Sequence, residues 1–339
     1  MLGAFAIAGA VGIGALIALG QLARRRLRHR YQPCGRLVDI GGYRLHLDER
    51  GTEHSGPTVV LEGGAMAPGL AWEPVQRRVA AFARVVSYDR AGLGWSDPSR
   101  RPRTAPEMAD ELRALLDAGE VPGPYVLVGH SLGGTIVRVF AAAYPERVAG
   151  LVLLDASHED QFTRAPRELR DFMAGMSRRM PALLGLLRLL VRGGIVALRP
   201  SLVPAAMGPL PAETLDAIRA RVAATPSVIA AMADEMRSLE ASNDAVRGLA
   251  IRSLGPIPLT VISHGRPEGV PPQFGPEVAA AYESLWQELQ VAQSTLSPLG
   301  RRAVADGVGH NVPTEAPELV ADAIRAMLDE ARRPGVLAS

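Results

Sequence analysis

The sequence predicts an α/β fold in which a doubly wound, mostly parallel sheet carries a helical segment after its sixth strand. Two patterns indicate this fold class. Short apolar runs alternate with helix-length segments along most of the chain, whereas the interval from residue 156 to residue 255 contains helical patterns and no strand pattern. Apolar residues also make up 47% of the 339 residues, which is enough for a sizeable core.

The first element is an apolar segment over residues 2–20, which contains no charged residue. About 20 apolar residues span a bilayer as a helix, and five arginines follow between positions 24 and 30. A cleaved signal peptide would carry positive charge before the apolar run instead. We therefore expect residues 1–30 to form a single-pass membrane anchor with a lipid-facing basic flank, the rest of the chain to be cytoplasmic, and no nucleic-acid partner.

The sheet is expected to begin with a hairpin, because apolar and polar residues alternate on both sides of Gly41 and Gly42. The strands that follow are apolar throughout, as is typical of parallel strands with helices on both faces. We expect these strands at Thr58–Leu61, Val85–Tyr88, Tyr125–Val128, Val148–Leu154, Leu259–Ile262 and Ala303–Ala305.

The interval without strands is expected to form a helical cap over residues 156–255, inserted into a core made of residues 31–155 and 256–339. Methionine is flexible and polarizable, so a methionine-rich cap indicates an adaptable apolar pocket and a hydrophobic substrate. The methionines in question are Met173, Met176, Met180, Met207, Met232 and Met236.

A candidate nucleophile follows the strand expected at Tyr125–Val128. Gly129, Ser131 and Gly133 match the pattern G-x-S-x-G, and a helical stretch comes next. In this strand–turn–helix context the pattern is the nucleophile elbow, in which small residues allow a strained turn to expose the serine. The helix N-terminus then favours negative charge that develops beside the serine.

From this motif on, the chain resembles the α/β-hydrolase superfamily over about residues 36–331. The matching segments occur in the expected order. Tyr88–Asp97 is similar to the D-x-x-G-x-G-x-S segment after the fourth strand, Pro145–Val148 to the lead into the sixth strand, and Gly309–His310 with Pro317–Glu318 to the C-terminal histidine loop and last helix. The resemblance implies a hydrolase without indicating which one.

His310 is the candidate general base, in a loop after the last strand that contains Gly307 and Gly309. A neutral imidazole titrates at about pH 6.5, which suits it to accept the serine proton and return it to a leaving group. Of the other histidines, His130 is expected to point into the fold, and His158 and His264, which follow the sixth and seventh strands, are expected to line the pocket. No cysteine, histidine and aspartate set has metal-ligand spacing, so we expect no metal and no cofactor.

An oxyanion hole needs two N–H donors directed at the developing charge. The first is expected from Leu132, directly after the nucleophile. The resemblance places the second in the loop after the third strand, where counting back from Trp72 assigns the donor to Ala65. Glu62, which ends that buried strand, is expected to be a hydrogen-bonded structural carboxylate.

Two carboxylates are candidates for the acid of a catalytic triad. Most α/β hydrolases carry an aspartate after the seventh strand, but residues 263–269 contain none. The resemblance implies Asp155 at the end of the sixth strand, where certain haloalkane dehalogenases carry the acid. Glu268 is the alternative, in which case Asp155 would be a helix N-cap.

A serine nucleophile forms an acyl-enzyme, which predicts a carboxylic ester hydrolase that accepts small hydrophobic esters or thioesters. Dehalogenase and epoxide-hydrolase relatives attack with a carboxylate at the elbow, so their chemistry is not expected here. The alternatives are a perhydrolase or peptidase that uses the same triad, and a catalytically silent hydrolase fold that serves as a binding module.

Overall fold

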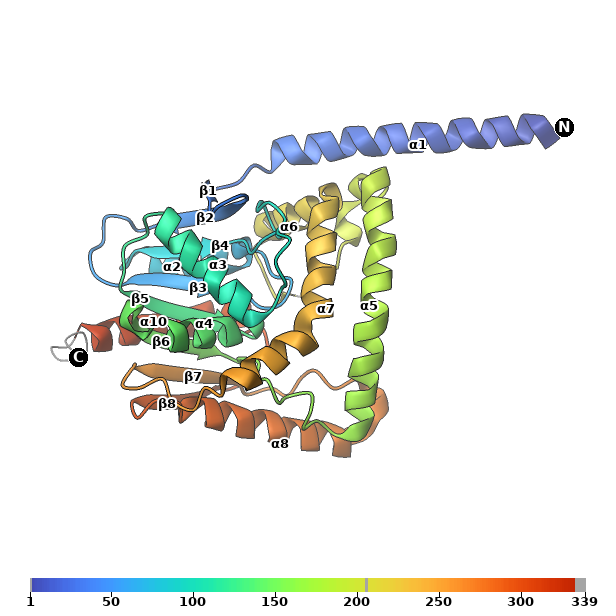
Figure 1. Ribbon diagram of the computed structural model, residues 1–339. Coiled ribbons are helices and arrows are strands. Elements are labelled where there is room, and N and C mark those ends of the chain that lie inside the picture. The colour runs from blue at the N-terminus through green and yellow to red at the C-terminus, as the bar shows by residue number, and fades with distance from the viewer. Residues whose placement is uncertain (1, 205–206, 333–339) are drawn as a thin grey trace.

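The computed structural model describes residues 2–204 and 207–332, with side chains from residue 11 onward. One sheet of eight strands has the order β1-β2-β4-β3-β5-β6-β7-β8 (Figure 1). β1 and β2 form the predicted antiparallel hairpin, β2 pairs antiparallel with β4, and the remaining pairs are parallel. The strands are β1 (Arg36–Asp39), β2 (Arg44–Arg50), β3 (Thr58–Glu62), β4 (Val85–Tyr88), β5 (Tyr125–His130), β6 (Val148–Leu154), β7 (Leu259–His264) and β8 (Gly300–Ala305). The predicted fold class is confirmed.

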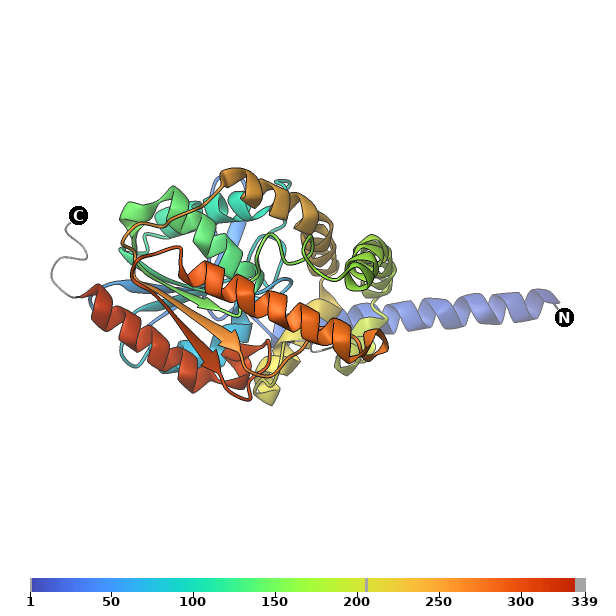
Figure 2. The same cartoon turned by 90° about the horizontal axis from the view of Figure 1, so that it is seen from below.

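Helices cover both faces of the central part of the sheet, which is why β3, β4 and β6 are buried along their whole length. Successive residues of β3 alternate between the faces: Val60 packs with α3 and α4, whereas Val59 and Leu61 pack with α2 and α10. α8 runs along β7 and β8, as Figure 2 shows from below. The core helices are α2 (Glu73–Val79), α3 (Ala105–Ala118), α4 (Leu132–Ala143), α8 (Gly275–Ser294), α9 (Val312–Glu315) and α10 (Pro317–Ala331), and the short 3₁₀ turns are η1 (Gly69–Trp72), η2 (Pro145–Arg147) and η5 (Pro272–Phe274).

The segment between β6 and β7 is helical, as predicted. It contains α5 (Arg167–Gly193), the 3₁₀ turns η3 (Val196–Leu198) and η4 (Pro200–Leu202), α6 (Ala212–Ala224) and α7 (Pro226–Leu249). α5 and α7 pack side by side beyond the ends of the strands (Figure 1). This cap has a small apolar core of its own. The first long helix of the cap begins at Arg167 with Pro166 as its N-cap, so Asp155 does not cap it.

The N-terminal helix α1 (Leu2–Arg30) differs from the predicted anchor. Within the described part of the chain, no helix is both long enough and apolar enough to cross a bilayer. This finding contradicts the predicted transmembrane anchor and the location derived from it, and it leaves the membrane as a partner without support.

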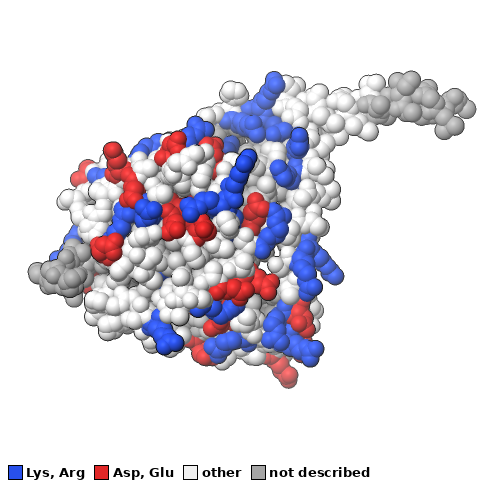
Figure 3. All heavy atoms as spheres, viewed as in Figure 1, with Lys and Arg blue, Asp and Glu red and all other residues white. Residues whose placement is uncertain are grey.

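The basic end of α1 lies against the cap. Gln21 and Arg24 donate hydrogen bonds to the carbonyl oxygen of Arg192 in the last turn of α5, at 2.8 and 2.9 Å. Arg24 and Arg28 donate to the carbonyl oxygen of Ala224, the last residue of α6, at 3.3 and 3.2 Å. Carbonyl groups in the last turn of a helix have no partner within it, and cations are favourable there. Arginines from the predicted lipid-facing block thus cap two helices, and basic side chains gather around the base of α1 in Figure 3.

Candidate active site

Ser131 occupies the predicted turn between β5 and α4. Its backbone has φ 52° and ψ −121°, a conformation that residues other than glycine rarely adopt, so the turn is strained. The flanking glycines are required by packing, because a Cβ on Gly129 would lie 2.5 Å from the Gly133 carbonyl oxygen and one on Gly133 would lie 2.3 Å from that of Glu62. The local sequence therefore places Ser131 at the N-terminus of α4.

Asp155 and His310 meet although 155 residues separate them. Asp155 directly follows β6 with a positive φ of 43°, is fully buried, and so lies at the same edge of the sheet as Ser131. His310 lies in the loop between β8 and α9, and its Nδ1 is 2.6 Å from Oδ2 of Asp155. The imidazole donates this hydrogen bond, because an ionised carboxylate can only accept, and the bond leaves Nε2 for other partners.

Ser131, Asp155 and His310 line one pocket with a volume of about 320 Å³. The pocket lies between the carboxyl edge of the strands, the cap and α8, and much of its wall is aromatic or apolar. The side chains of that kind are Phe162, Met173, Tyr282 and Trp286. The structure thus brings the three predicted triad residues together in a cavity of a size that suits a small organic molecule.

Glu268, the alternative acid, also lines this pocket but contacts a different part of His310. Its Oε2 accepts a hydrogen bond from the His310 backbone N–H at 3.2 Å, and its Oε1 pairs with the guanidinium of Arg266 at 2.7 Å. The imidazole Nδ1 is bonded to Asp155 instead. Glu268 is therefore placed to support the histidine loop.

Of the two histidines that the sequence suggested as pocket residues, His158 does not line this pocket, whereas His264 lines it and also contacts Asp155. Its backbone N–H and its Nδ1 are each 3.0 Å from Oδ1 of Asp155, and its Nε2 is 2.9 Å from Oε2 of Glu283 on α8. Burial alone would lower the pKa of His264, but the hydrogen bonds and charges of Asp155 and Glu283 outweigh burial and raise the pKa to about 9. His264 is therefore an imidazolium at neutral pH.

Asp155 accepts a further hydrogen bond from the indole Nε1 of Trp286, at 2.8 Å. Burial by itself would raise the pKa of Asp155, but the hydrogen bonds from His264 and His310 outweigh burial and hold the pKa well below its usual range. Asp155 is consequently an ionised carboxylate, and both of its oxygens accept hydrogen bonds. These bonds fix its orientation toward His310.

His130, inside the elbow motif, points into the fold as expected and holds the histidine loop. Its Nε2 is 2.8 Å from the carbonyl oxygen of His310, and the two imidazole rings lie 4.9 Å apart. Burial and the neighbouring His310 lower the pKa of His130 to about 3. The neutral ring donates from Nε2, so the bond to a carbonyl oxygen also defines its tautomer.

The loop after β3 passes directly beside the nucleophile. A Cβ on Gly64 would lie 3.3 Å from Cβ of Ser131 and 3.0 Å from Nδ1 of His130, so only glycine fits there without displacement. Ala65 is the next residue, and Leu132 is the first residue of α4, where a backbone N–H has no partner within the helix. Both predicted oxyanion donors therefore belong to segments that adjoin Ser131.

Arg90, after β4, holds that loop from inside the protein. Its guanidinium donates to Oε1 of Glu62 and to the carbonyl oxygens of Gly63 and Gly64, each at 2.7 Å. Glu62 accepts a second hydrogen bond, from the hydroxyl of Tyr88. Glu62 is thus a hydrogen-bonded structural carboxylate, as the sequence suggested. The sequence did not show that Arg90 is its partner.

The sequence patterns did not indicate four residues of the site, which are Arg90, Glu235, Glu283 and Trp286. A signal existed for Arg90, because a carboxylate at the end of a buried strand requires a buried cation, and Arg90 follows the strand that pairs with β3. Glu235 and Glu283 lie within helices, where a glutamate on the solvent face has the same local pattern. Only the packing of those helices distinguishes them.

Comparisons with known proteins agree with this architecture. The chain is 32% identical over 120 residues to the 2-(acetamidomethylene)succinate hydrolase of Mesorhizobium japonicum, a match that covers 35% of this chain and 42% of that protein. Among solved structures, an esterase from Thermogutta terrifontis has a TM-score of 0.59 at 24% identity and covers 88% of this chain and 99% of its own. The epoxide hydrolase CorEH has a TM-score of 0.65 at 19% identity and covers 88% and 99%.

The curated relatives match only part of their own length, between 17 and 52%. The family model described as the alpha/beta hydrolase fold matches residues 57–250, which is more than half of the chain. Within the described residues, no group of three His, Cys, Asp or Glu side chains is arranged to hold a metal ion. The matched segment contains the elbow, Asp155 and the cap, and the chain belongs to the α/β-hydrolase fold family.

Proposed function

We propose that this protein is a serine hydrolase that cleaves carboxylic esters through an acyl-enzyme, with Ser131 as nucleophile, His310 as general base and Asp155 as the acid that orients it. One observation carries the proposal: the His310 Nδ1–H donates to Asp155 Oδ2 at 2.6 Å in the pocket that Ser131 also lines. This bond selects the tautomer whose Nε2 can accept a proton from a serine hydroxyl.

The reaction follows from these roles. Ser131 Oγ attacks the ester carbonyl carbon while Nε2 of His310 takes its proton, and the carbonyl oxygen becomes an oxyanion. The N–H groups of Leu132 and Ala65 stabilise that charge. When the tetrahedral intermediate collapses, His310 protonates the departing alcohol. Water then attacks the acyl-enzyme with His310 again as base, which releases the acid and restores Ser131.

The preferred substrate class is a small hydrophobic ester, with thioesters as close analogues. The pocket volume of about 320 Å³ and its aromatic and methionine wall support an apolar acyl group of modest size. A serine at the elbow separates this chemistry from that of relatives that use a carboxylate nucleophile. The similarity to a solved esterase supports a fold that can carry such chemistry. The proposed chemistry itself is argued from the residues of the site.

The test is covalent labelling by a fluorophosphonate probe together with turnover of p-nitrophenyl esters of increasing acyl length. We expect Ser131→Ala to abolish labelling and to lower turnover by about 10⁴-fold or more. The matched control is Ser157→Ala, because Ser157 Oγ lies 3.5 Å from Ser131 Oγ in the same pocket. A folded wild-type protein that neither labels nor turns over any ester would instead indicate a binding module.

A further inference from the structure

Glu235 is a buried carboxylate from the cap that reaches the loop beside the nucleophile. It lies in the middle of α7, and 1% of its side chain is exposed. Its Oε1 accepts from Nε of Arg90 at 2.7 Å, and its Oε2 accepts from Nη2 of Arg90 at 3.1 Å. Oε2 also accepts from the backbone N–H of Met66 at 2.7 Å. One cap residue therefore contacts both the guanidinium that holds the loop and the loop itself.

Arg90 uses its whole donor set in this arrangement. A guanidinium has five N–H donors in a planar fork, and the five hydrogen bonds described go to Glu62, Glu235, Gly63 and Gly64. Burial opposes the charge of Arg90, but Glu235 and Glu62 outweigh burial and raise its pKa. The carbonyl groups of Gly63 and Gly64 are thus tied to a cation that cannot lose its proton.

The conformation of the loop requires such support. Met66 has a φ of 62°, in the left-handed region that a residue with a long side chain rarely occupies. A strained residue persists only when its surroundings hold it. Here the Met66 N–H is held by Glu235 and the two preceding glycine carbonyls by Arg90, which leaves Ala65 fixed between bonded neighbours.

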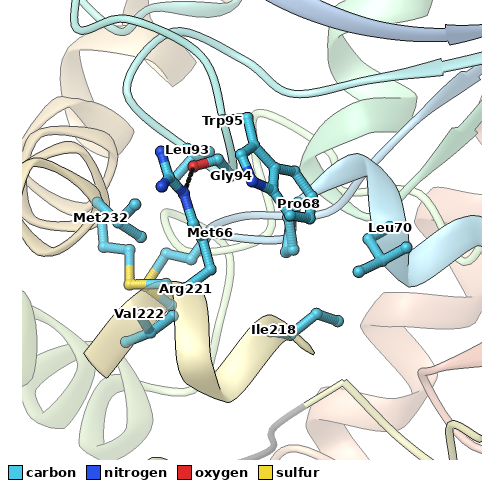
Figure 4. Close-up of a pocket in the computed structure, with 11 residues that line it drawn as sticks. Met66, Pro68, Leu70, Leu93, Gly94, Trp95, Ile218, Arg221, Val222 and Met232 are labelled. Atoms are coloured by element: carbon cyan, nitrogen blue, oxygen red, sulfur yellow. Dashed lines mark hydrogen bonds between the residues drawn. The ribbon is translucent and has the colours of Figure 1, made fainter. Parts of the chain in front are cut away.

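Apolar packing joins the same two elements. Figure 4 shows the Met66 side chain pointing toward Val222 of α6 and Met232 of α7. The cavity that remains between these side chains is about 10 Å³, the space of a single water molecule. The cap therefore contacts the loop by both charged and apolar groups. Glu235 and Met232 come from neighbouring turns of α7, and Val222 comes from α6.

We infer that Glu235 is a positioning residue: acting through Arg90 and the Met66 amide, it holds the loop of residues 63–66 in the shape in which the Ala65 N–H faces the oxyanion formed at Ser131. The inference rests on the proposed function, because it concerns the same reaction. It assigns the cap a part in transition-state stabilisation, in addition to enclosing the substrate.

The inference predicts a particular kinetic signature for Glu235→Gln. Gln carries no charge, and with its one oxygen at the Oε2 position its amide nitrogen would face the Nε–H of Arg90, a donor against a donor. It therefore cannot hold the guanidinium of Arg90 as Glu235 does. A misplaced oxyanion donor affects the transition state more than the bound substrate, and loss of one such donor lowers kcat by about 100-fold. We therefore expect kcat to fall by about 100-fold while KM changes by less than about threefold.

A second measurement separates this role from general damage to the fold. A boronic acid binds serine hydrolases as a tetrahedral adduct, so its Ki should weaken in Glu235→Gln by the same factor as kcat/KM falls. Arg90→Lys, which keeps the charge but not the five-donor fork, should behave alike. The matched control is Glu240→Gln, because Glu240 lies on the same helix but is exposed, and it should leave kcat and Ki unchanged. Unchanged kcat or unchanged boronic-acid affinity in a folded Glu235→Gln protein would overturn the inference.

Hydrogen exchange on the wild-type protein keeps the inference testable if Glu235→Gln does not fold. We expect amides of residues 63–66 and of α7 around Glu235 to become exposed together, in a single opening event. Fast exchange in the loop beside a protected α7 would contradict the coupling. A wild-type protein that fluorophosphonate does not label would instead refute the proposed function, while the exchange result would still decide whether cap and loop are coupled.

Discussion

Asp155 is the residue on which the site converges, because four donors from three elements meet at its two oxygens. They are the backbone N–H and Nδ1 of His264, the indole of Trp286 and Nδ1 of His310. A carboxylate in a buried position is stable only when its lone pairs are occupied by such donors. Their arrangement leaves Asp155 one orientation, and that orientation determines where His310 points.

The first mutational prediction distinguishes the two candidate acids. Asp155→Asn replaces an acceptor with an amide that cannot hold the working tautomer of His310, so kcat should fall on the order of 10⁴-fold. Glu268→Gln keeps an oxygen for the His310 backbone N–H, so its loss should stay below about tenfold. Steady-state kinetics on the same p-nitrophenyl ester measures both. The opposite order of effects would assign the acid to Glu268.

At the scale of elements, α1 is attached to the cap through helix termini. Arg24 and Arg28 donate to carbonyl groups at the ends of α5 and α6, where such groups otherwise lack partners. The predicted basic flank is therefore part of the packing between elements. Its side chains compensate the negative ends of two helix dipoles.

Loss of these two arginines should lower stability without affecting the chemistry. We expect the double variant Arg24→Ala with Arg28→Ala to lower the free energy of unfolding by about 1 to 2 kcal/mol, as measured by urea denaturation, with kcat unchanged. The control is Arg25→Ala with Arg26→Ala, which removes the same charge from exposed positions of the same helix. Equal losses in the two double variants would show that net charge matters and the capping contacts do not.

At the scale of the whole molecule, His264 and His130 give stability a dependence on pH from opposite sides. His264 has a folded pKa of about 9, above its unfolded value of about 6.5. Its contribution is therefore complete below about pH 6.5 and is lost as the pH rises through about 9. His130 has a folded pKa of about 3, so the unfolded chain binds its proton first and stability is lost as the pH falls from about 6.5 to about 3.

Thermal unfolding should accordingly give the highest Tm between about pH 6 and 7. His264→Gln should lower Tm at neutral pH and flatten the decline between about pH 7 and 9.5, because the group that titrates there has been removed. His29→Gln, which changes an exposed histidine of α1, should leave the profile unchanged. An alkaline decline that persists in full in His264→Gln would show that another group is responsible.

Local patterns in the sequence were enough to predict several features of the fold. Alternation around Gly41 and the apolar runs predicted the hairpin and the strands, because side-chain periodicity reflects which faces are buried. The elbow was predictable because a strained turn needs glycines at definite spacing from Ser131. The apolar run of α1 was misinterpreted, since composition alone does not reveal that its arginines cap neighbouring helices.

Which distant groups meet depends on how the elements pack in three dimensions. Whether Asp155 or Glu268 contacts the imidazole of His310 depends on where the loop of His310 closes, and local sequence carries no information about that distance. The contacts of Glu235 with Arg90, 145 residues away, and of Glu283 with His264 arise from the packing of helices on the sheet. A buried charge requires a partner in space, and the sequence can show the need without naming the partner.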